Sequence, residues 1–433
     1  MHTVAIFDTA GATGLPDLLD AAAGWCDFVV VNAGQRPWSD NERGMLEGEA
    51  RFVEGSGLDG AAISRLLAEA RVDSVLTFGD EMIPLVAEVA SRLGLHYHSP
   101  ETAAAVTRKD VQRRLLAEAG VQKMRHVAFH DAPTPEQIRE IGFPAVLKPV
   151  HGNGSAHVYP VDDETELAEA LERMRAEELS MPEQFGTPFG FDDGAPLQLE
   201  ERLTGAPHPG AAWLGDYLSV ETLTFGPGDH WHFWVLDRLP LTPPFRESGL
   251  LGPTQLPDDV RDAVCALTRA ALDALGVTSG LSHTEIKLTP HGPRIIEVNG
   301  RLGGFVSSLL GRSAGADVTR LALEAAAGLA KRRPIEARSC TLALLVQPPT
   351  EAREVVRLAD PAALSRLPGV WRVDVRAAPG TKVDYRAGTL GRVQTVWLEA
   401  ATPEELHEVL LRVKSVLATE NVYVREELAD GGV

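Results

Sequence analysis

Two glutamates and an asparagine lie in a segment whose pattern predicts a β-hairpin. Apolar and polar residues alternate along residues 283–304, on either side of a turn that contains proline and glycine. A turn centred on His291 places Glu285 directly opposite Glu297 on the neighbouring strand. Asn299 shares that face because side chains alternate along a strand. Like charges in this arrangement repel, so the face needs a compensating cation.

These oxygen ligands suit metal and phosphate chemistry. Carboxylate and amide oxygens are ligands for Mg²⁺, which leaves its other positions to water and phosphate oxygens. Arg301 follows with a guanidinium fork, and Gly303 and Gly304 supply unobstructed backbone N–H groups. The segment therefore predicts a site for a metal, a phosphate and a developing negative charge on oxygen. The alternative is a solvated hairpin whose acids face water beside Lys287.

Two lysines precede the hairpin in contexts that suit phosphate binding. Lys109 lies on an amphipathic helix predicted over residues 102–119, and Lys148 ends an apolar strand bounded by two prolines. A lysine in such a strand must pair its charge or extend its ammonium group to water. Gly154 and Ser155 follow in a loop whose N–H groups could close over phosphates.

The pattern along the chain indicates several domains. A chain of 433 residues is too long for one ordinary hydrophobic core. Short apolar strands alternate with helical patterns in the first hundred residues, which predicts a parallel sheet in an α/β domain. Residues 180–196, rich in Pro, Gly and Asp, predict a linker or mobile loop. Short strands and one helix after residue 335 predict a separate α+β module.

Composition narrows the class of protein. The hydrophobic content of 44% and the charged content of 24% are typical of soluble globular proteins. The net charge of −20 argues against a nucleic-acid partner. Three cysteines far apart in the sequence provide neither a disulfide framework nor a CxxC zinc site. We found no signal-peptide pattern and no apolar run of transmembrane length, so we expect no membrane partner and a cytoplasmic location.

Taken together, the motifs resemble those of the ATP-grasp superfamily of carboxylate-amine ligases, most closely its L-amino acid (dipeptide) ligases. The likeness covers roughly residues 80–330 and rests on Thr-Arg-Lys at Lys109, Leu-Lys-Pro at Lys148, His-Thr-Glu-Ile-Lys at Glu285, and Glu-Val-Asn-Gly-Arg-Leu-Gly-Gly beginning at Glu297. It implies a multidomain α/β and α+β protein with an ATP-grasp fold. The expected domains are an N-terminal α/β domain (1–105), a small subdomain with a phosphate lid (106–195), a large subdomain with the metal and substrate site (196–335) and a C-terminal α+β domain (336–433).

The resemblance also implies which residues contact the nucleotide. They are Lys109, Lys148, Gly154, Ser155, Glu200 and the backbone of Arg202 and Leu203. Two departures from the family pattern stand out. The lid usually ends Ser-x-Gly, whereas this chain has His157 at the last position. The acidic residue expected to hold the ribose shortly after Gly205 is absent, which leaves Asp216 or Glu221 open as substitutes.

A second group of residues would bind metal and substrate. The resemblance implies that Glu285, Glu297 and Asn299 hold two Mg²⁺ ions, with Mn²⁺ as an alternative. The catalytic residues would be Arg301, beside the transferring phosphoryl group, and Lys148. The substrate ligands would be Arg246, Arg301 and Gly304. For Arg246 the alternative is an ordinary surface arginine.

The implied activity is that of an ATP-dependent ligase. An amino-acid carboxylate is activated as an acyl phosphate and joined to the amino group of a second amino acid, giving a dipeptide with an α- or γ-glutamyl-type amide, ADP and phosphate. The alternatives are an ATP-grasp carboxylase or other acyl-phosphate-forming enzyme, and a non-catalytic nucleotide-binding regulator. The expected partners are small amino-acid substrates, with neither nucleic acid nor membrane, and a homodimer is left open.

Overall fold

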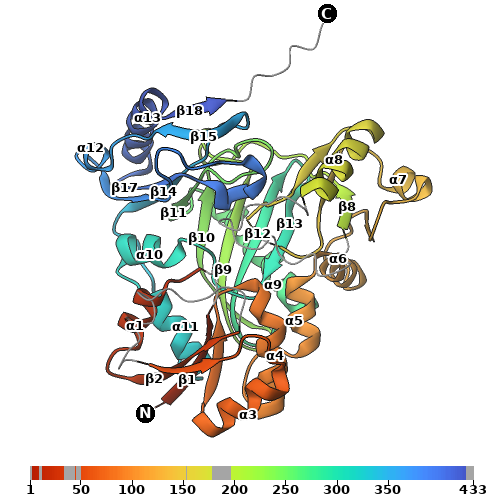
Figure 1. Cartoon of the computed structure of the whole chain (residues 1–433), viewed down its shortest axis with the longest axis vertical. Coiled ribbons are helices and arrows are strands. Elements are labelled where there is room, and N and C mark those ends of the chain that lie inside the picture. Colours follow the sequence, from red (N-terminus) through yellow and green to blue (C-terminus); the bar gives the residue numbers. More distant parts are fainter. Residues whose placement is uncertain are drawn as a thin grey trace, which may run out of the picture. The chain divides into compact units, whose positions relative to one another are not determined.

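A computed structural model of the chain describes residues 2–8, 12–33, 44, 50–152, 154–177 and 197–425 (Figure 1). The segment predicted as a linker, 180–196, lies outside these residues. The chain divides into two compact units, each assembled from three stretches. The first contains Met1–Met124, Leu218–Val235 and Pro257–Glu336, and the second contains Arg125–Tyr217, Leu236–Leu256 and Ala337–Val433. The four-domain division remains a prediction.

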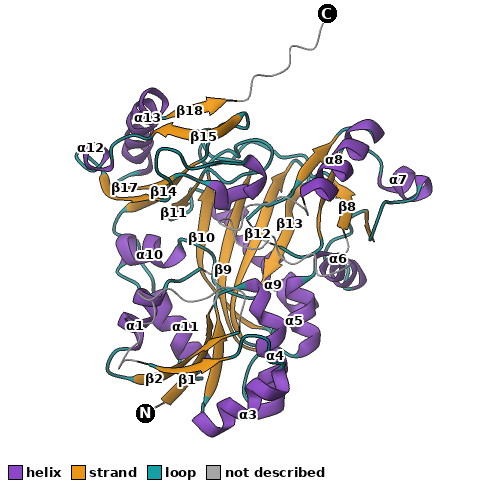
Figure 2. Ribbon diagram, viewed as in Figure 1, coloured by secondary structure: helices purple, strands orange, loops and turns teal. Residues whose placement is uncertain are grey.

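The first unit begins with a four-stranded parallel sheet in the order β3-β2-β1-β4. Its strands are β1 (His2–Asp8), β2 (Cys26–Asn32), β3 (Arg51–Glu54) and β4 (Ser74–Thr77). Alternate residues such as Ala5, Phe7 and Val29 pack in one core with α3 (Gly60–Ala70) and α4 (Ile83–Leu93). Figure 2 shows α1 (Leu15–Ala22) and α11 (Val318–Ala326) on the other side of this sheet. The predicted parallel α/β arrangement is confirmed.

Four neighbouring strands of a longer sheet, in the order β13-β12-β9-β10, carry the predicted hairpin. These strands are β9 (Tyr217–Gly226), β10 (Asp229–Arg238), β12 (Gly280–Thr289) and β13 (Gly292–Asn299). The strands pair Thr289 with Gly292, so the turn is centred slightly before His291. If this register continued along the whole hairpin, Glu285 would lie opposite Ile296. A bulge next to Glu285 shifts the register by one residue. Glu285 therefore pairs with Glu297, as predicted.

The predicted helix over residues 102–119 is two helices in the structure. These are α5 (Pro100–Thr107) and α6 (Lys109–Glu118), and they are separated at Arg108, whose backbone is extended (φ −117°, ψ 114°). The guanidinium group of Arg108 turns back to Asp110 at 2.8 Å. Because of this break, Lys109 is the first residue of a new helix rather than a residue in the middle of a long one.

Side chains of α6 form hydrogen bonds with the backbone groups on the outer edge of β13, which is the last strand of its sheet. Gln112 donates to the carbonyl of Val298 at 2.7 Å and accepts from its N–H at 2.9 Å. Arg113 donates to the carbonyl of Ile296 at 2.6 Å. Unpaired backbone groups on a buried edge are costly, so these contacts replace the missing neighbouring strand. They fix the main chain on both sides of Glu297.

The second unit holds a four-stranded antiparallel sheet in the order β5-β8-β6-β7. Its strands are β5 (His126–Phe129), β6 (Ala145–Pro149), β7 (Tyr159–Val161) and β8 (Leu197–Glu201). Residues of α7 (Pro135–Ile141) and α8 (Glu164–Glu177) complete its core. Lys148 lies directly opposite Gln198 in this sheet, and Val146 lies opposite Glu200.

The rest of the second unit contains the strands and the helix predicted after residue 335, which are called the C-terminal module here, together with β11. Four further strands of the longer sheet run in the order β11-β14-β17-β16: β11 (Gly249–Gly252), β14 (Cys340–Val346), β17 (Gln394–Ala400) and β16 (Val370–Val375). β15 (Ala352–Arg357) pairs with β18 (Val422–Arg425), and α12 (Pro361–Leu364) and α13 (Pro403–Glu420) complete the module. None of the helices in the described part of the chain is both long and apolar enough to cross a membrane.

Replacing Gln112 tests whether its hydrogen bonds to the backbone of Val298 stabilise the edge of β13. Gln112→Met retains the length of the side chain but leaves the N–H and carbonyl groups of Val298 unpaired. We expect the free energy of unfolding to fall by about 2–4 kcal/mol, measured by urea denaturation. Arg114→Met on the exposed side of α6 is the control, and its expected change is within about 0.5 kcal/mol. Equal effects of the two substitutions would contradict this account.

Candidate active site

The predicted metal ligands come together on one face of the hairpin. Asn299 Nδ2 donates to Glu297 Oε1 at 3.1 Å, and Glu285 is the cross-strand partner of Glu297. The Nζ atom of Lys109 lies 3.2 Å from Glu297 Oε2. The side chain of Glu297 is 10% exposed, so its charge is only weakly screened by water. Lys109 thus offsets part of the charge of the carboxylate pair.

The donor set fits a hard divalent cation. Two carboxylates and an amide oxygen are the protein ligands that Mg²⁺ takes when water and phosphate complete its coordination. No group of three or more His, Cys, Asp or Glu surrounds a single point within the described residues. Two carboxylates and one amide oxygen leave positions for water and phosphate oxygens in the coordination of such an ion.

A buried histidine adjoins this carboxylate pair. His283 Nε2 lies 3.4 Å from Glu285 Oε1, and its Nδ1 lies 2.5 Å from Glu221 Oε1. Burial lowers the pKa of His283, but the charges and hydrogen bonds of Glu221 and Glu285 outweigh burial and raise that pKa to about 9. Glu221, considered above as a ribose ligand, is fully buried and hydrogen-bonded inside the first unit. It is not placed to hold a ribose.

Arg301 is held by Asp80, a residue outside the motifs that predict the site. Asp80 Oδ2 accepts from Arg301 Nε at 3.0 Å and from Nη2 at 2.6 Å. Burial lowers the pKa of Arg301, yet Asp80, followed by Glu297 and Glu285, raises it overall, so the guanidinium stays charged. Asp80 begins the short helix η1 (Asp80–Met82) just after β4. A carboxylate at the carboxyl end of a parallel strand is a signal that could have identified it.

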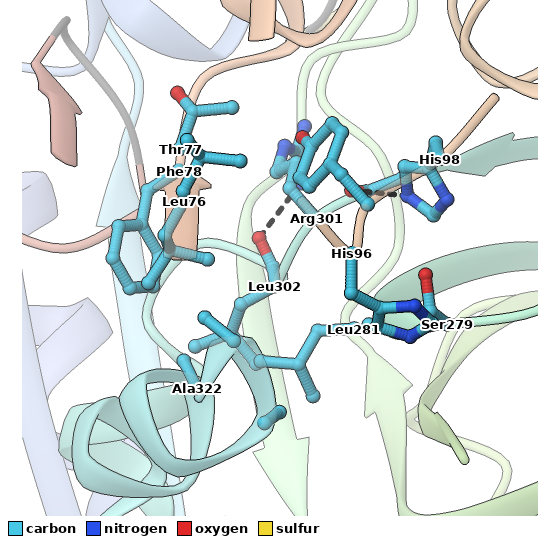
Figure 3. A pocket seen from close by; sticks show the side chains of 16 residues that line it. Leu76, Thr77, Phe78, His96, His98, Ser279, Leu281, Arg301, Leu302 and Ala322 are labelled. Carbon is cyan, nitrogen blue, oxygen red and sulfur yellow. Dashed lines mark hydrogen bonds between the residues drawn. The ribbon is translucent and has the colours of Figure 1, made fainter. Parts of the chain in front are cut away.

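A small pocket adjoins Arg301 in the first unit (Figure 3). Its volume of about 40 Å³ is room for a few water molecules, far less than a ligand site needs. Leu76, Phe78, Leu281 and Leu302 are among its lining residues. In Figure 3 Arg301 Nη1 donates to the carbonyl of Leu302 at 3.1 Å. We therefore assign no substrate to this pocket.

In the second unit Lys148 is paired rather than solvated. Its ammonium group forms an ion pair with Glu200, and Gln198 Nε2 donates to the other oxygen of that carboxylate at 2.6 Å. Both charged side chains are only 6% exposed. Lys148 and Glu200 are both among the residues expected to contact a nucleotide. A buried ion pair of this kind leaves an uncompensated charge if either partner is removed.

The residues expected at the adenine follow Glu200 directly. The N–H of Arg202 donates to the carbonyl of Pro144 at 3.0 Å, and its guanidinium pairs with Asp162 at 2.7 Å. Among the described residues the N–H of Leu203 donates to no backbone carbonyl outside the regular helices and strands. The adenine role of these residues stays a prediction.

The predicted phosphate loop packs on the C-terminal module within the second unit. The N–H of Thr389 donates to the carbonyl of Gly154 at 2.7 Å, and the N–H of His157 donates to the carbonyl of Arg386 at 3.3 Å. Ser155 and His157 both have positive φ, at 56° and 55°. The contacting segment is the 3₁₀ helix η3 (Tyr385–Gly391). Backbone hydrogen bonds to η3 thus support the predicted phosphate loop.

Two predicted substrate residues have different surroundings. Arg246 is 1% exposed and donates to the carbonyls of Pro243 at 2.9 Å and Pro348 at 2.7 Å. Burial lowers its pKa to about 10. Arg246 is therefore not the surface arginine of the alternative, and its role as a substrate ligand stays a prediction. Gly304, in contrast, has open space where a Cβ would lie.

The structure thus gathers the predicted residues into two groups. Lys109, Glu285, Glu297, Asn299, Arg301 and Gly304 belong to the first unit, and Lys148, Gly154, Ser155, Glu200, Arg202, Leu203 and Arg246 belong to the second. The fold is that of the ATP-grasp ligases, as the resemblance implied, with mixed α/β and α+β parts. The chain matches the crystal structure of L-amino acid ligase from Bacillus licheniformis with a TM-score of 0.74 and 20% identity, over 98% of this chain and 99% of that one.

Sequence comparison points the same way, although no family model matches the chain. The chain is 27% identical to the uncharacterized protein y4rH of Sinorhizobium fredii over 77% of its length, 26% identical to carnosine synthase 1 of Homo sapiens over 64%, and 28% identical to alanine–anticapsin ligase of Bacillus subtilis over 54%. These matches span 66%, 34% and 49% of the relatives. The predicted relationship is confirmed: the chain is related to the amino acid ligases among the ATP-grasp carboxylate-amine ligases.

Gly388→Ala tests the support of the phosphate loop. Gly388 has φ 59° and ψ −141°, and a Cβ there would fall 2.2 Å from the carbonyl oxygen of Gly154. We expect the Thr389 N–H to exchange with deuterium at least about tenfold faster, because the displacement breaks its hydrogen bond and strain of this kind costs about 1–3 kcal/mol.

Gly380→Ala is the matched control for this experiment. Gly380 also has positive φ, at 89°, but no atom lies within 4 Å of the position of its Cβ. The control should leave exchange at Thr389 unchanged. Unchanged exchange in Gly388→Ala as well would show that η3 does not hold the loop.

Proposed function

We propose that this chain is an ATP-dependent carboxylate-amine ligase that joins two amino acids and releases ADP and phosphate. The observation that carries the proposal is the carboxylate pair of Glu285 and Glu297, held opposite one another beside the cation Lys109. The names of two relatives, carnosine synthase 1 and alanine–anticapsin ligase, and that of the L-amino acid ligase of matching fold support the substrate class.

In this proposal most of the residues that contact the nucleotide belong to the second unit. The ammonium groups of Lys148 and, in the first unit, Lys109 offset the charge of the ATP phosphates. The N–H groups of Gly154 and Ser155 close over these phosphates as a lid. Glu200 and the backbone of Arg202 and Leu203 contact the adenine.

The first unit would bind the metal and direct the chemistry. Glu285, Glu297 and Asn299 would hold two Mg²⁺ ions, or Mn²⁺ in their place. When bound, the ions would neutralise charge on the β- and γ-phosphates of ATP. These roles agree with the hard oxygen donors on the hairpin face, whose like charges require a cation.

The chain's other residues would then act on the acyl group. A substrate carboxylate attacks the γ-phosphoryl group of ATP, which gives an acyl phosphate and ADP. The guanidinium group of Arg301, kept charged by Asp80, stabilises negative charge on the acyl oxygen, with N–H groups near Gly304. The lid excludes water, which would otherwise hydrolyse the acyl phosphate. The amino group of a second amino acid attacks the acyl carbon, and phosphate leaves.

We also retain a cytoplasmic location as a proposal. All three cysteines, Cys26, Cys265 and Cys340, are free thiols in the structure. Thiols in this state are typical of proteins in a reducing compartment.

The test of this function is the release of ADP and phosphate from Mg-ATP across a matrix of paired amino acids, with mass spectrometry of the products. We expect release that depends on two amino acids and a product with the condensed mass. Release that depends only on bicarbonate would favour a carboxylase, and nucleotide binding without turnover on any pair would favour a regulator. Either result would overturn the proposal.

Variants make the same assay specific to the hairpin. Glu297→Gln should lower turnover by at least about a hundredfold, because it removes a ligand charge from the metal site. Glu354→Gln is the control, since Glu354 is also a strand glutamate that pairs with a lysine, Lys382, but it lies on β15. The control should retain full turnover. Full turnover in Glu297→Gln would remove this residue from the site.

A further inference from the structure

A buried carboxylate on β9 connects two parts of the candidate site. Glu221 is fully buried. Its Oε1 lies 2.5 Å from His283 Nδ1 and accepts from Ser219 Oγ at 3.3 Å, and its Oε2 accepts from the N–H of Gly303 at 3.1 Å. Every one of these contacts lies in the first unit. Glu221 therefore ties the hairpin strand β12 to the loop that follows Arg301.

The histidine carries this connection to the metal face. His283 Nε2, on the opposite side of the ring from Glu221, lies 3.4 Å from Glu285 Oε1. The side chain of Glu285 is 23% exposed, whereas that of His283 is only 5% exposed. A fixed ring thus contacts one oxygen of a carboxylate that would otherwise rotate in a partly open space.

The loop after Arg301 packs tightly against the same pair. A Cβ on Gly303 would fall 2.4 Å from His283 Nδ1 and 2.9 Å from Glu221 Oε1. Only glycine leaves room for this approach of backbone to side chains. The position of the loop between Arg301 and Gly304 therefore depends on where the histidine and the glutamate lie.

We propose that Glu221 and His283 are positioning residues, which orient Glu285 toward the metal and hold the loop from Arg301 to Gly304 at the acyl group. The inference deepens the proposed function and rests on it. Groups behind a metal ligand fix its orientation, and their removal typically weakens metal binding by about 10–100-fold. Glu221 contacts both His283 and the N–H of Gly303. It therefore fixes the position of the metal ligands relative to the loop from Arg301 to Gly304.

The competing account is that the pair is only a satisfied buried contact. The first unit offers a matched pair for comparison. His230 Nδ1 contacts Thr224 Oγ1 at 2.8 Å, and His230 Nε2 lies 3.0 Å from Asp273 Oδ1. His230 thus contacts a hydroxyl group through one ring nitrogen and a carboxylate through the other, whereas His283 contacts a carboxylate through each. Asp273 is not one of the proposed metal ligands. A purely structural role predicts similar consequences for the two histidines.

The experiment compares His283→Asn with His230→Asn. The asparagine amide occupies the region of Nδ1, so each variant retains a polar group there and loses the Nε2 contact with a carboxylate. Mn²⁺ is titrated into the full chain with saturating ADP, and free Mn²⁺ is followed by electron paramagnetic resonance, with a protein-free titration as the correction for Mn-ADP. Urea unfolding midpoints are measured on the same samples.

We expect His283→Asn to weaken Mn²⁺ binding by about 10–100-fold and His230→Asn to leave it unchanged. If His283→Asn does not fold, Glu221→Gln, which keeps an acceptor for the N–H of Gly303, should change Mn²⁺ affinity in the same direction. Wild-type affinity in a folded His283 or Glu221 variant would overturn the inference and leave the proposed function standing. Wild-type affinity in Glu297→Gln would instead overturn the proposed metal site, and this inference with it.

Discussion

Repulsion between Glu285 and Glu297 is the constraint on which the first unit depends. Residues directly opposite on antiparallel strands have Cβ atoms about 5 Å apart, so two carboxylates in these positions destabilise a hairpin that lacks a compensating charge. The structure surrounds the pair with groups that offset it: Lys109 and Asn299 contact Glu297, and His283 contacts Glu285. The proposed metal site would add a divalent cation to these compensating groups.

Helix α6, whose side chains hydrogen-bond to the edge of β13, also carries Lys109, which pairs with Glu297. Gln112 and Arg113 bond to the strand on both sides of Glu297, and Lys109 begins the helix beside them. Hydrogen bonds from these side chains to the backbone of β13 therefore fix the start of α6, and with it the Cα of Lys109, relative to Glu297. Rigid elements with satisfied supporting contacts are what a precise site requires.

Local patterns predicted the parts of the site that lie close together in the sequence. The hairpin pairing of Glu285 with Glu297 followed from alternation and turn residues, although the turn lies slightly earlier than predicted and a bulge restores the pairing. Contacts between distant segments had no comparable signal. Asp80 reaches Arg301 across more than two hundred residues, and the burial of Arg246 against carbonyl groups depends on the loop at Pro348. Periodicity reports which face a residue occupies but not which distant partner it meets.

The most direct measurement is the anomalous scattering of Mn²⁺ in crystals of the chain grown with MnCl₂ and ADP. The account predicts an anomalous peak that is contacted by carboxylate oxygens of both Glu285 and Glu297, with nucleotide phosphate oxygens in the remaining positions. A peak held by other residues, or a nucleotide bound with no peak between these two glutamates, would contradict it.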